Sequence, residues 1–273
     1  MDRKKIADII IDKLEMNESS IRESVNKSIN KIGYFYLDDL LPEDYVKKLY
    51  NVFPETKDMV LRKDLREYKY IGVQMSKYDS LLEESIYAFQ DQRIVDFMAK
   101  IFNLEKVYPD PNLYAGGISV MKKNNFLNPH LDNSHDKDRN RWRVLNLLYY
   151  VTPGWGEDYG GDFEIWGNGI NKSQIRIHSK FNRLVVMITH NSAWHSVSPI
   201  KYNGNRCCIS NYYFSDFSAK NNTDFHVTSF RARPQEKIKD IILRLDSAIR
   251  MSIRSFFKMG IKKEFHIYKD KNK

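Results

Sequence analysis

The sequence has only two cysteines among its 273 residues, and these two, Cys207 and Cys208, are adjacent. Neighbouring residues in a strand point to opposite faces, which disfavours a disulfide between them. The chain also lacks any run of about 20 apolar residues, the length that a membrane-spanning helix needs. Its N-terminus carries no apolar segment of the signal-peptide type. These absences favour a folded protein in a reducing, cytoplasmic setting, without disulfides and without a membrane span.

Positive charge is abundant but unevenly distributed. The formal net charge is +9, and from Pro234 to Lys273 eleven Lys and Arg stand against five Asp and Glu. A basic excess within one terminal segment is typical of a solvated helix face, and less often of a surface for nucleic acid, membrane or an acidic partner. With 42% hydrophobic and 13% aromatic residues, the chain has the composition of a folded protein. We therefore expect no nucleic-acid partner.

Helical periodicity marks the N-terminal region. It predicts two helices within 2–32, a short strand at 34–37, a helix at about 41–53 and another at about 81–103. Ser19 or Ser20 is the expected cap of the second helix. Residues 57–80 are charged and Tyr-rich with little periodicity, and we expect them to be irregular.

The character of the sequence changes after Pro111. Short β-rich runs separated by Gly, Asn and Pro recur at 113–121, 143–152, 162–166, 173–178, 183–189, 194–198 and 206–214. This spacing is typical of an all-β sandwich or barrel. We predict a mainly β core over 113–233, preceded over 1–112 by helices with one strand that pack on it, for an α+β chain overall.

A third region, 234–273, returns to helical spacing as a basic amphipathic helix and tail. Its apolar residues are Ile238, Ile241, Ile242, Leu245, Ile249, Ile253, Phe256 and Phe257, and its opposite face holds Lys237, Arg244, Arg254 and Lys258. We expect the apolar stripe to pack on the outside of the β-core. A homodimer through the same stripe is the alternative, and the oligomeric state stays open.

Two histidines and one carboxylate have the pattern of a metal site. His130 and Asp132 are separated by one residue, so their side chains project to the same side of a strand end. The third ligand must come from a distant strand. His195 is our choice, because it follows a turn-forming Asn-Ser pair and begins a β-run; the rivals are His135, His178 and His190. Two histidines and a carboxylate occupy one face of an Fe(II) ion and leave three positions open.

An arginine eleven residues after His195 adds a place for an anion. Arg206 begins the apolar run Cys-Cys-Ile-Ser-Asn-Tyr-Tyr-Phe. A buried arginine is costly without an anionic partner, and its planar fork binds a carboxylate through two parallel hydrogen bonds. HxD and a single arginine are weak signals separately. Their order along the chain, with a Gly-Gly strand between them, is specific.

Residues 113–215 resemble the catalytic core of the Fe(II)/2-oxoglutarate-dependent dioxygenases, in the prolyl 4-hydroxylase-like branch. The resemblance rests on the HxD motif, on His195 and Arg206, and on the runs Arg143-Val-Leu-Asn-Leu-Leu-Tyr-Tyr, Gly160-Gly-Asp-Phe-Glu-Ile-Trp and Phe181-Asn-Arg-Leu-Val-Val-Met. Upstream, Gly33-Tyr-Phe-Tyr-Leu-Asp-Asp-Leu-Leu-Pro-Glu resembles the strand and helix that precede this core. The fold that this implies is a double-stranded β-helix, or jelly roll.

The resemblance also implies an enzyme, a hydroxylase that uses Fe(II), 2-oxoglutarate and O2, with L-ascorbate as an additional reductant. Because a halogenating relative would need the carboxylate position vacated for a halide, Asp132 favours hydroxylation. The implied site residues are His130, Asp132 and His195 for iron, and Arg206, Tyr150 and Ser210 for the 2-oxoglutarate carboxylate.

The substrate is expected to be a polar small molecule, such as an amino acid, a sugar or a metabolic intermediate. Lys122-Lys-Asn-Asn-Phe-Leu-Asn-Pro stands where the branch usually has Pro-Gly before HxD, and the 133–142 loop is unusually charged. Residues expected to line the substrate pocket are Asn146, Lys122, His135 and Arg141, with Lys123 and Arg143 near its mouth. A peptidyl proline is the alternative substrate. A metal-binding β-barrel without catalysis, acting as a binding module, is the alternative of another class.

Overall fold

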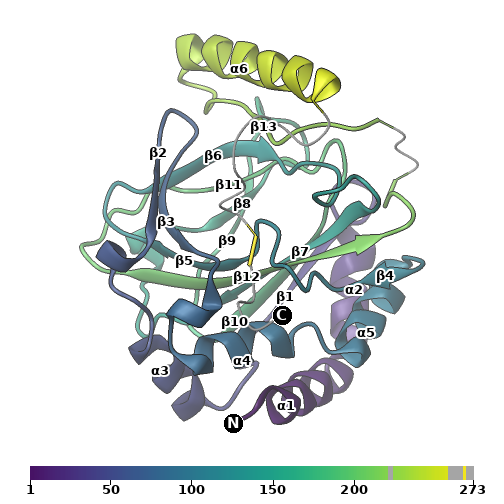
Figure 1. Cartoon of the computed structure of the whole chain (residues 1–273), viewed down its shortest axis with the longest axis vertical. Coiled ribbons are helices and arrows are strands. Elements are labelled where there is room, and N and C mark those ends of the chain that lie inside the picture. The colour runs from purple at the N-terminus through teal and green to yellow at the C-terminus, as the bar shows by residue number, and fades with distance from the viewer. Residues whose placement is uncertain (221–223, 258–266, 269–273) are drawn as a thin grey trace.

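A computed structural model describes residues 1–220, 224–257 and 267–268 of the chain. Among these residues, thirteen antiparallel strands form one curled sheet, with α1, α3, α4 and α5 gathered at one end and α6 at the other (Figure 1). The helices are α1 (Arg3–Met16), α2 (Glu18–Ser28), α3 (Glu43–Asn51), α4 (Ser80–Ala88), α5 (Gln92–Phe102) and α6 (Lys237–Phe256).

The strands follow the order β1-β10-β7-β12-β5-β3-β6-β11-β8-β9, with β13 on β6, β2 on β3 and β4 on β12. Strand β3 pairs with both β5 and β6, so the sheet turns there and closes into a half-barrel of the double-stranded β-helix type. The expected fold class is confirmed. The strands are β1 (Tyr34–Leu37), β2 (Val60–Lys63), β3 (Glu67–Gly72), β4 (Val107–Tyr108), β5 (Gly117–Met121), β6 (Phe126–Leu131), β7 (Trp142–Tyr150), β8 (Phe163–Ile165), β9 (Ile175–Ile177), β10 (Arg183–Ile188), β11 (His195–Val197), β12 (Arg206–Ser215) and β13 (Ser229–Phe230).

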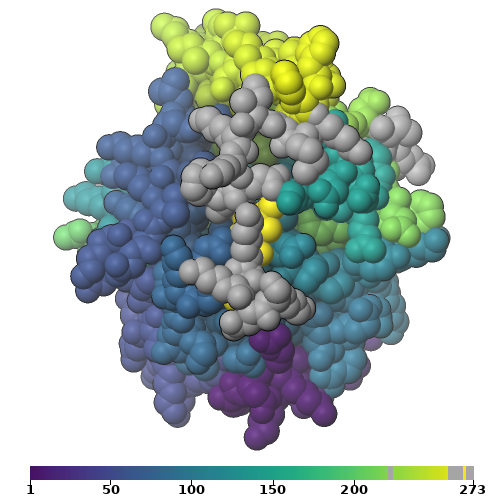
Figure 2. Space-filling model, viewed as in Figure 1, coloured from purple at the N-terminus to yellow at the C-terminus, as the bar shows by residue number. Residues whose placement is uncertain are grey.

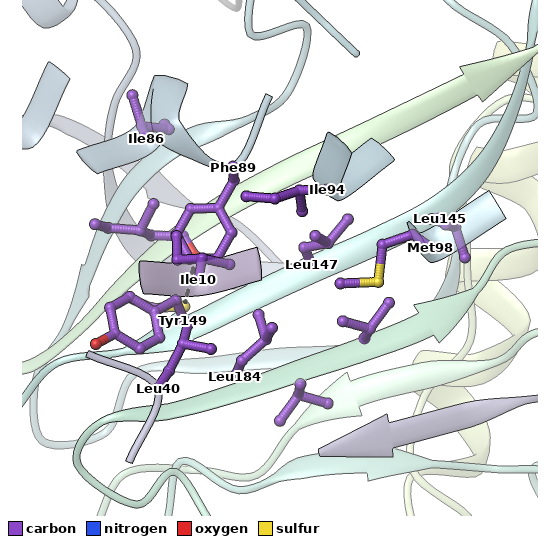
Figure 3. Close-up of a cluster of buried hydrophobic side chains, with 14 of the residues drawn as sticks. Ile10, Leu40, Ile86, Phe89, Ile94, Met98, Leu145, Leu147, Tyr149 and Leu184 are labelled. Carbon is purple, nitrogen blue, oxygen red and sulfur yellow. Dashed lines mark hydrogen bonds between the residues drawn. The ribbon is translucent and has the colours of Figure 1, made fainter. Parts of the chain in front are cut away.

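The N-terminal helices cover the outer face of the sheet (Figure 3). Alternate residues of β7 point outward into this core, where the ring of Tyr149 lies 5.6 Å from that of Phe89. The intervening residues of β7, Asn146, Leu148 and Tyr150, therefore point into the half-barrel. One continuous hydrophobic core joins the helices to the sheet. The division of the chain at 112 and 233 stays a prediction.

Two sequence-based expectations for the N-terminal region are wrong. Residues 57–80 are not irregular but contain the β2–β3 hairpin, whose charged and aromatic side chains hide the usual alternation; in β3 the Lys69 ammonium pairs with the Glu67 carboxylate at 3.0 Å. The expected helix at 81–103 is two helices, because the Asp91 carboxylate caps a new one by accepting a hydrogen bond from the backbone N–H of Arg93. Asn17, not Ser19 or Ser20, is the N-cap residue of α2.

The orientation of α6 also contradicts the sequence-based expectation. Ile238, Leu245 and Ile249 of its apolar stripe are 78%, 60% and 60% exposed, and Leu243 is its only fully buried residue among those described. The helix is held through its polar side instead, by hydrogen bonds and ion pairs to the segment around β13. The stripe therefore does not pack on the β-core. Lys258, expected on the basic face, lies outside the described residues.

Candidate active site

The three candidate ligands, His130, Asp132 and His195, come together where two strands that are distant in sequence pair with each other. His130 lies in β6 and pairs directly with His195 in β11, and Asp132 follows the end of β6. Nε2 of His130 lies 3.7 Å from one carboxylate oxygen of Asp132, and Nε2 of His195 lies 3.6 Å from the other. One ligand atom from each residue lies within 4.8 Å of the other two. The side chains are at most 8% exposed.

Both imidazoles are oriented by the backbone. Nδ1 of His130 lies 3.0 Å from the carbonyl oxygen of Asn128, and Nδ1 of His195 lies 3.0 Å from that of Ala193. A carbonyl oxygen can only accept, so each Nδ1 carries the proton and each Nε2 directs its lone pair toward Asp132. A hydrogen bond from the ring nitrogen that does not face the site is typical of histidines that bind a metal.

The electrostatics of the site fit a divalent cation. Burial, with His195 beside it, lowers the pKa of His130 to about 3, so this imidazole is neutral at ordinary pH. Burial alone would raise the pKa of Asp132, but His195 and Arg143 outweigh it and keep the pKa below its usual value. One oxygen of Asp132, Oδ2, is buried without a hydrogen-bond partner. Two imidazoles that each present Nε2, and a carboxylate with one oxygen that accepts no hydrogen bond, match the donor set that Fe(II) takes in oxygenases.

An arginine, Arg143, faces the carboxylate of Asp132. Nη1 of Arg143, at the start of β7, lies 3.6 Å from Oδ1 of Asp132, and its side chain is only 1% exposed. The guanidinium lies 4.0 Å from the ring centroid of Tyr212 and near the ring of Tyr114, while its Nε is buried without a partner. A fixed positive charge with a free donor thus stands beside the three candidate ligands.

Arg206 lies at the other end of the half-barrel interior. It begins β12, is 3% exposed, and forms no ion pair with any carboxylate among the described residues. Its Nε donates to the hydroxyl of Ser179 at 2.9 Å, and its Cζ lies 4.6 Å from the ring centroid of Tyr150. A buried guanidinium without an anion is costly, so this end of the interior is suited to a carboxylate ligand.

Further polar groups point into the interior from β7 and β12. The Tyr150 hydroxyl is buried without a hydrogen-bond partner, and burial raises its pKa, which keeps it a donor. Ser210 is half-buried and shares the strand face of Arg206, four residues away. Asn146 pairs in register with Tyr212, and its amide oxygen is buried without a partner.

The Gly-Gly run explains how Arg206 reaches its position. Gly161 has φ +78°, and a Cβ there would lie 2.6 Å from Cδ of Arg206 and 2.4 Å from Ile200. The Ser179 hydroxyl donates to the carbonyl oxygen of Gly161 while it accepts from Arg206. The sequence carries the glycine signal, but nothing in it marks Ser179, which lies in the loop between β9 and β10.

Three of the four residues expected in the substrate pocket have other described contacts. Arg141 lies over the Tyr108 ring at 3.6 Å, and His135 packs its ring 4.0 Å from that of Trp142. Lys122, at the end of β5, bonds through its backbone to Asn125. Asn146 points into the half-barrel, on the strand face that it shares with Tyr150. A pocket does open beside Asp132 and Arg143, and its lining includes His190, Ser218 and His226.

The rival histidines do not belong to the group of three candidate ligands. His178 contacts Asp162 and the backbone of Trp155, and His190 bonds through Nδ1 to Ser192. Among the described residues, the only group of histidine, cysteine, aspartate and glutamate side chains close enough to share a metal ion is His130, Asp132 and His195.

Residues 116–214 match the family model of the 2OG-Fe(II) oxygenase superfamily. This segment holds the three candidate metal ligands and Arg206, in the geometry described above. The match and the site geometry together indicate a 2-oxoglutarate-dependent oxygenase. The superfamily expected from the sequence is therefore confirmed. The oxygenase matches no curated protein significantly.

Solved structures support the fold of the oxygenase. A Pseudomonas putida prolyl-4-hydroxylase is 17% identical, with a TM-score of 0.52 over 71% of this chain and 98% of that one. A Phytophthora capsici prolyl 4-hydroxylase is 15% identical, with a TM-score of 0.53 over 92% of this chain and 80% of that one. A Burkholderia pseudomallei oxidoreductase of the 2OG-Fe(II) oxygenase family is 13% identical, with a TM-score of 0.51 over 73% and 91%. At these identities the likeness concerns the fold alone.

Proposed function

We propose that this oxygenase hydroxylates a C–H bond of a polar small molecule, such as an amino acid, a sugar or a metabolic intermediate, and releases succinate and CO2. The observation that carries the proposal is that one interior holds both a set of candidate metal ligands and a separate group of donors suited to a carboxylate. His130, Asp132 and His195 offer a metal three ligands, and Arg206 with Tyr150 offers a carboxylate two kinds of donor. This pairing suits 2-oxoglutarate, which has both a metal-chelating end and a distant carboxylate.

The residues of the chain then have distinct tasks. His130 and His195 would bind Fe(II) through Nε2, and Asp132 would bind it through Oδ2, which accepts no hydrogen bond. When bound, iron with 2-oxoglutarate and dioxygen supplies the oxidising chemistry. Arg206, held by Ser179, would bind the far carboxylate of 2-oxoglutarate, assisted by the hydroxyls of Tyr150 and Ser210.

The polar nature of the substrate is supported by groups near the candidate iron site. The Nε donor of Arg143 and the amide oxygen of Asn146 are both buried without partners. An unpaired buried polar group costs about 1–3 kcal/mol, which a ligand that pairs with it recovers. A substrate with hydrogen-bonding groups, and an anionic one in particular, therefore fits better than a hydrocarbon.

The direct test is the formation of succinate from 2-oxoglutarate by the purified protein with Fe(II). We expect turnover that Asp132→Ala and His195→Ala abolish, and that Arg206→Ala reduces through a higher KM for 2-oxoglutarate. Full turnover in the Asp132 and His195 variants would refute the ligand assignment. Metal binding without any turnover would instead indicate a binding module without catalysis.

The same assay can identify the substrate class. Amino acids, sugars and proline-containing peptides would be screened for a gain of one oxygen atom that depends on 2-oxoglutarate and O2. A gain confined to the peptides would overturn the small-molecule proposal. We also propose L-ascorbate as a reductant, which should prolong turnover, and a cytoplasmic location, which the buried free thiols of Cys207 and Cys208 support.

A further inference from the structure

Helix α6 is bound to the rest of the protein by its polar side. The Asp240 carboxylate pairs with Arg231 at 2.7 Å and accepts a hydrogen bond from the backbone N–H of Ala232. The Ser247 hydroxyl accepts one from the backbone N–H of Phe230. These polar contacts, with Leu243 between them, place the opposite side of the helix toward solvent.

That outward side is apolar along the whole helix. Its large side chains are at least 46% exposed, except for the half-buried Ile253, and Figure 2 shows α6 as a ridge along one end of the molecule. A 20-residue helix is about 30 Å long, so the stripe is longer than an isolated surface residue or pair would explain. Its members and their exposed fractions are Ile238 78%, Ile241 59%, Ile242 46%, Leu245 60%, Ile249 60%, Phe256 85% and, at the C-cap, Phe257 57%.

The acidic residues of α6 face the rest of the protein, and its unpaired basic residues face solvent. Its two acidic residues are both paired: Asp240 with Arg231, and Asp246 with Arg250 at 2.9 Å and Arg66 at 3.5 Å. Two basic residues, Lys237 and Arg244, lie seven residues apart along one border of the apolar stripe. Both are exposed and form no ion pair with the described residues. The solvent-facing half of α6 therefore combines isoleucine, leucine and phenylalanine with positive charge only.

We propose that α6 is a membrane-docking helix that lies flat on an anionic lipid surface. Its apolar stripe would enter the boundary between headgroups and acyl chains, while Lys237 and Arg244 would contact the anionic headgroups. An amphipathic helix with a strong apolar face and basic flanks binds such surfaces by these two contributions. No described helix has the length and apolar character needed to cross a bilayer.

The charge pattern favours a lipid surface over a second copy of the chain. In a symmetric α6–α6 pair, each helix would bring Lys237 and Arg244 to the rim and no unpaired carboxylate to meet them. Like charges at an interface rim oppose association, whereas anionic headgroups complement them. The inference rests on α6 alone and is independent of the proposed reaction.

The test is co-sedimentation of the full chain with lipid vesicles. We expect binding to vesicles of phosphatidylcholine mixed with phosphatidylglycerol, and little binding to phosphatidylcholine alone. The double variant Leu245→Ser/Ile249→Ser should lose binding. The double variant Lys237→Glu/Arg244→Glu should weaken it by roughly tenfold or more, because each basic residue near an anionic surface contributes about 1 kcal/mol.

Matched controls separate α6 from general hydrophobicity and charge. Leu61→Ser/Leu65→Ser removes two side chains that are 48% and 51% exposed on the β2–β3 hairpin. Lys123→Glu/Lys201→Glu makes the same change in net charge at two exposed sites elsewhere. Both controls should bind as the wild type does, and thermal melting would establish that every variant is folded.

Three results would overturn the proposal. The first is no binding of the wild type to the anionic vesicles. The second is equal loss of binding in the α6 charge variant and the Lys123/Lys201 control, which would reduce the effect to net charge. The third is a dimer in sedimentation equilibrium that Leu245→Ser/Ile249→Ser dissociates while vesicle binding is absent, which would identify a second copy as the occupant of the stripe.

Discussion

The Phe230 ring lies nearly parallel to the His130 imidazole, with 5.2 Å between the ring centroids and an interplanar angle of 17°. The two residues also pair in register between β13 and β6, and the backbone N–H of Arg231 donates to the carbonyl oxygen of Pro129. Phe230 is bound to α6 through Ser247. A two-residue strand outside the segment that matches the superfamily thus supports one of the candidate iron ligands.

Phe230→Ala should weaken metal binding, because it removes the surface that fixes the His130 ring. Truncation of a buried phenylalanine costs about 3–5 kcal/mol of stability, so the variant must be compared at conditions where it is folded. Competition with a chelator would measure the affinity for Fe(II). Phe230→Leu, which keeps most of the packing volume, is the control and should lose less. Equal Fe(II) affinity in folded Phe230→Ala would mean that the ring serves packing alone.

Gly161→Ala should raise the KM for 2-oxoglutarate. A methyl group there would meet Cδ of Arg206 at 2.6 Å, so the guanidinium must move from its present position. Gly154→Ala is a matched control, since Gly154 also has a positive φ but has nothing within 4 Å of the added Cβ. Both variants bear a similar backbone strain of about 1–3 kcal/mol. If their KM values rise equally, strain rather than contact with Arg206 explains the effect.

Two adjacent tyrosines in β7, Tyr149 and Tyr150, allow the affinity for 2-oxoglutarate to be tested separately from the stability of the fold. Tyr150→Phe removes a hydroxyl that has no partner, so stability should be unchanged or higher, while the Kd for 2-oxoglutarate should rise by roughly tenfold or more through loss of a hydrogen bond to a charged group. Tyr149→Phe removes a hydroxyl that donates to Asn182 at 2.6 Å on the outer face. That variant should lose about 1 kcal/mol of stability and keep its affinity.

Calorimetric titration of 2-oxoglutarate, with a redox-inert divalent metal in place of iron, would measure both affinities. Urea unfolding would measure both stabilities. Unchanged affinity in Tyr150→Phe would remove Tyr150 from the proposed cosubstrate site.

The candidate ligands could be predicted from sequence because their signals are local. The HxD motif places two side chains on the same side of a strand end. An arginine that begins an apolar strand is buried in most folds, and a buried arginine is costly without an anion. Tyr150 follows from the resemblance to the dioxygenases, and Asn146 from strand alternation relative to Tyr150. Ser179 and Phe230 could not be predicted, because each acts through a contact with a residue distant in sequence and neither has a pattern of its own.

The orientation of α6 shows a different limit. Helical periodicity correctly groups Ile238, Leu245 and Ile249 on one side, but it does not say what that side faces. The usual assumption is that the apolar side turns inward. Here the contacts of Asp240 and Ser247 with the β13 segment hold the polar side inward instead, and those contacts depend on tertiary structure that periodicity does not contain.

The buried carboxyl of Asp110 makes a prediction about pH. Its side chain has one oxygen, Oδ2, without a partner, and burial raises its pKa to about 6, although Arg143 opposes the shift. In the unfolded chain the pKa is near 3.8, so between about pH 4 and 6 the folded state holds a proton that the unfolded state has released. The free energy of unfolding therefore falls as pH rises through this window, and the loss persists at pH 7.

Asp110→Asn should remove this loss and stabilise the protein at pH 7 by about 1–3 kcal/mol, since each pH unit between the two pKa values is worth 1.36 kcal/mol at most. The amide oxygen can still accept the hydrogen bond that the backbone N–H of Asn112 gives to Asp110.

The gain in stability should shrink as the pH is lowered and vanish near pH 4, where the wild-type carboxyl is protonated when folded. Urea unfolding from pH 4 to 8 would measure it, with Asp96→Asn at an exposed position of α5 as the control that should show no such gain. A gain of equal size at pH 4 and pH 7 would show that the substitution acts through packing, and that the buried charge of Asp110 is not its source.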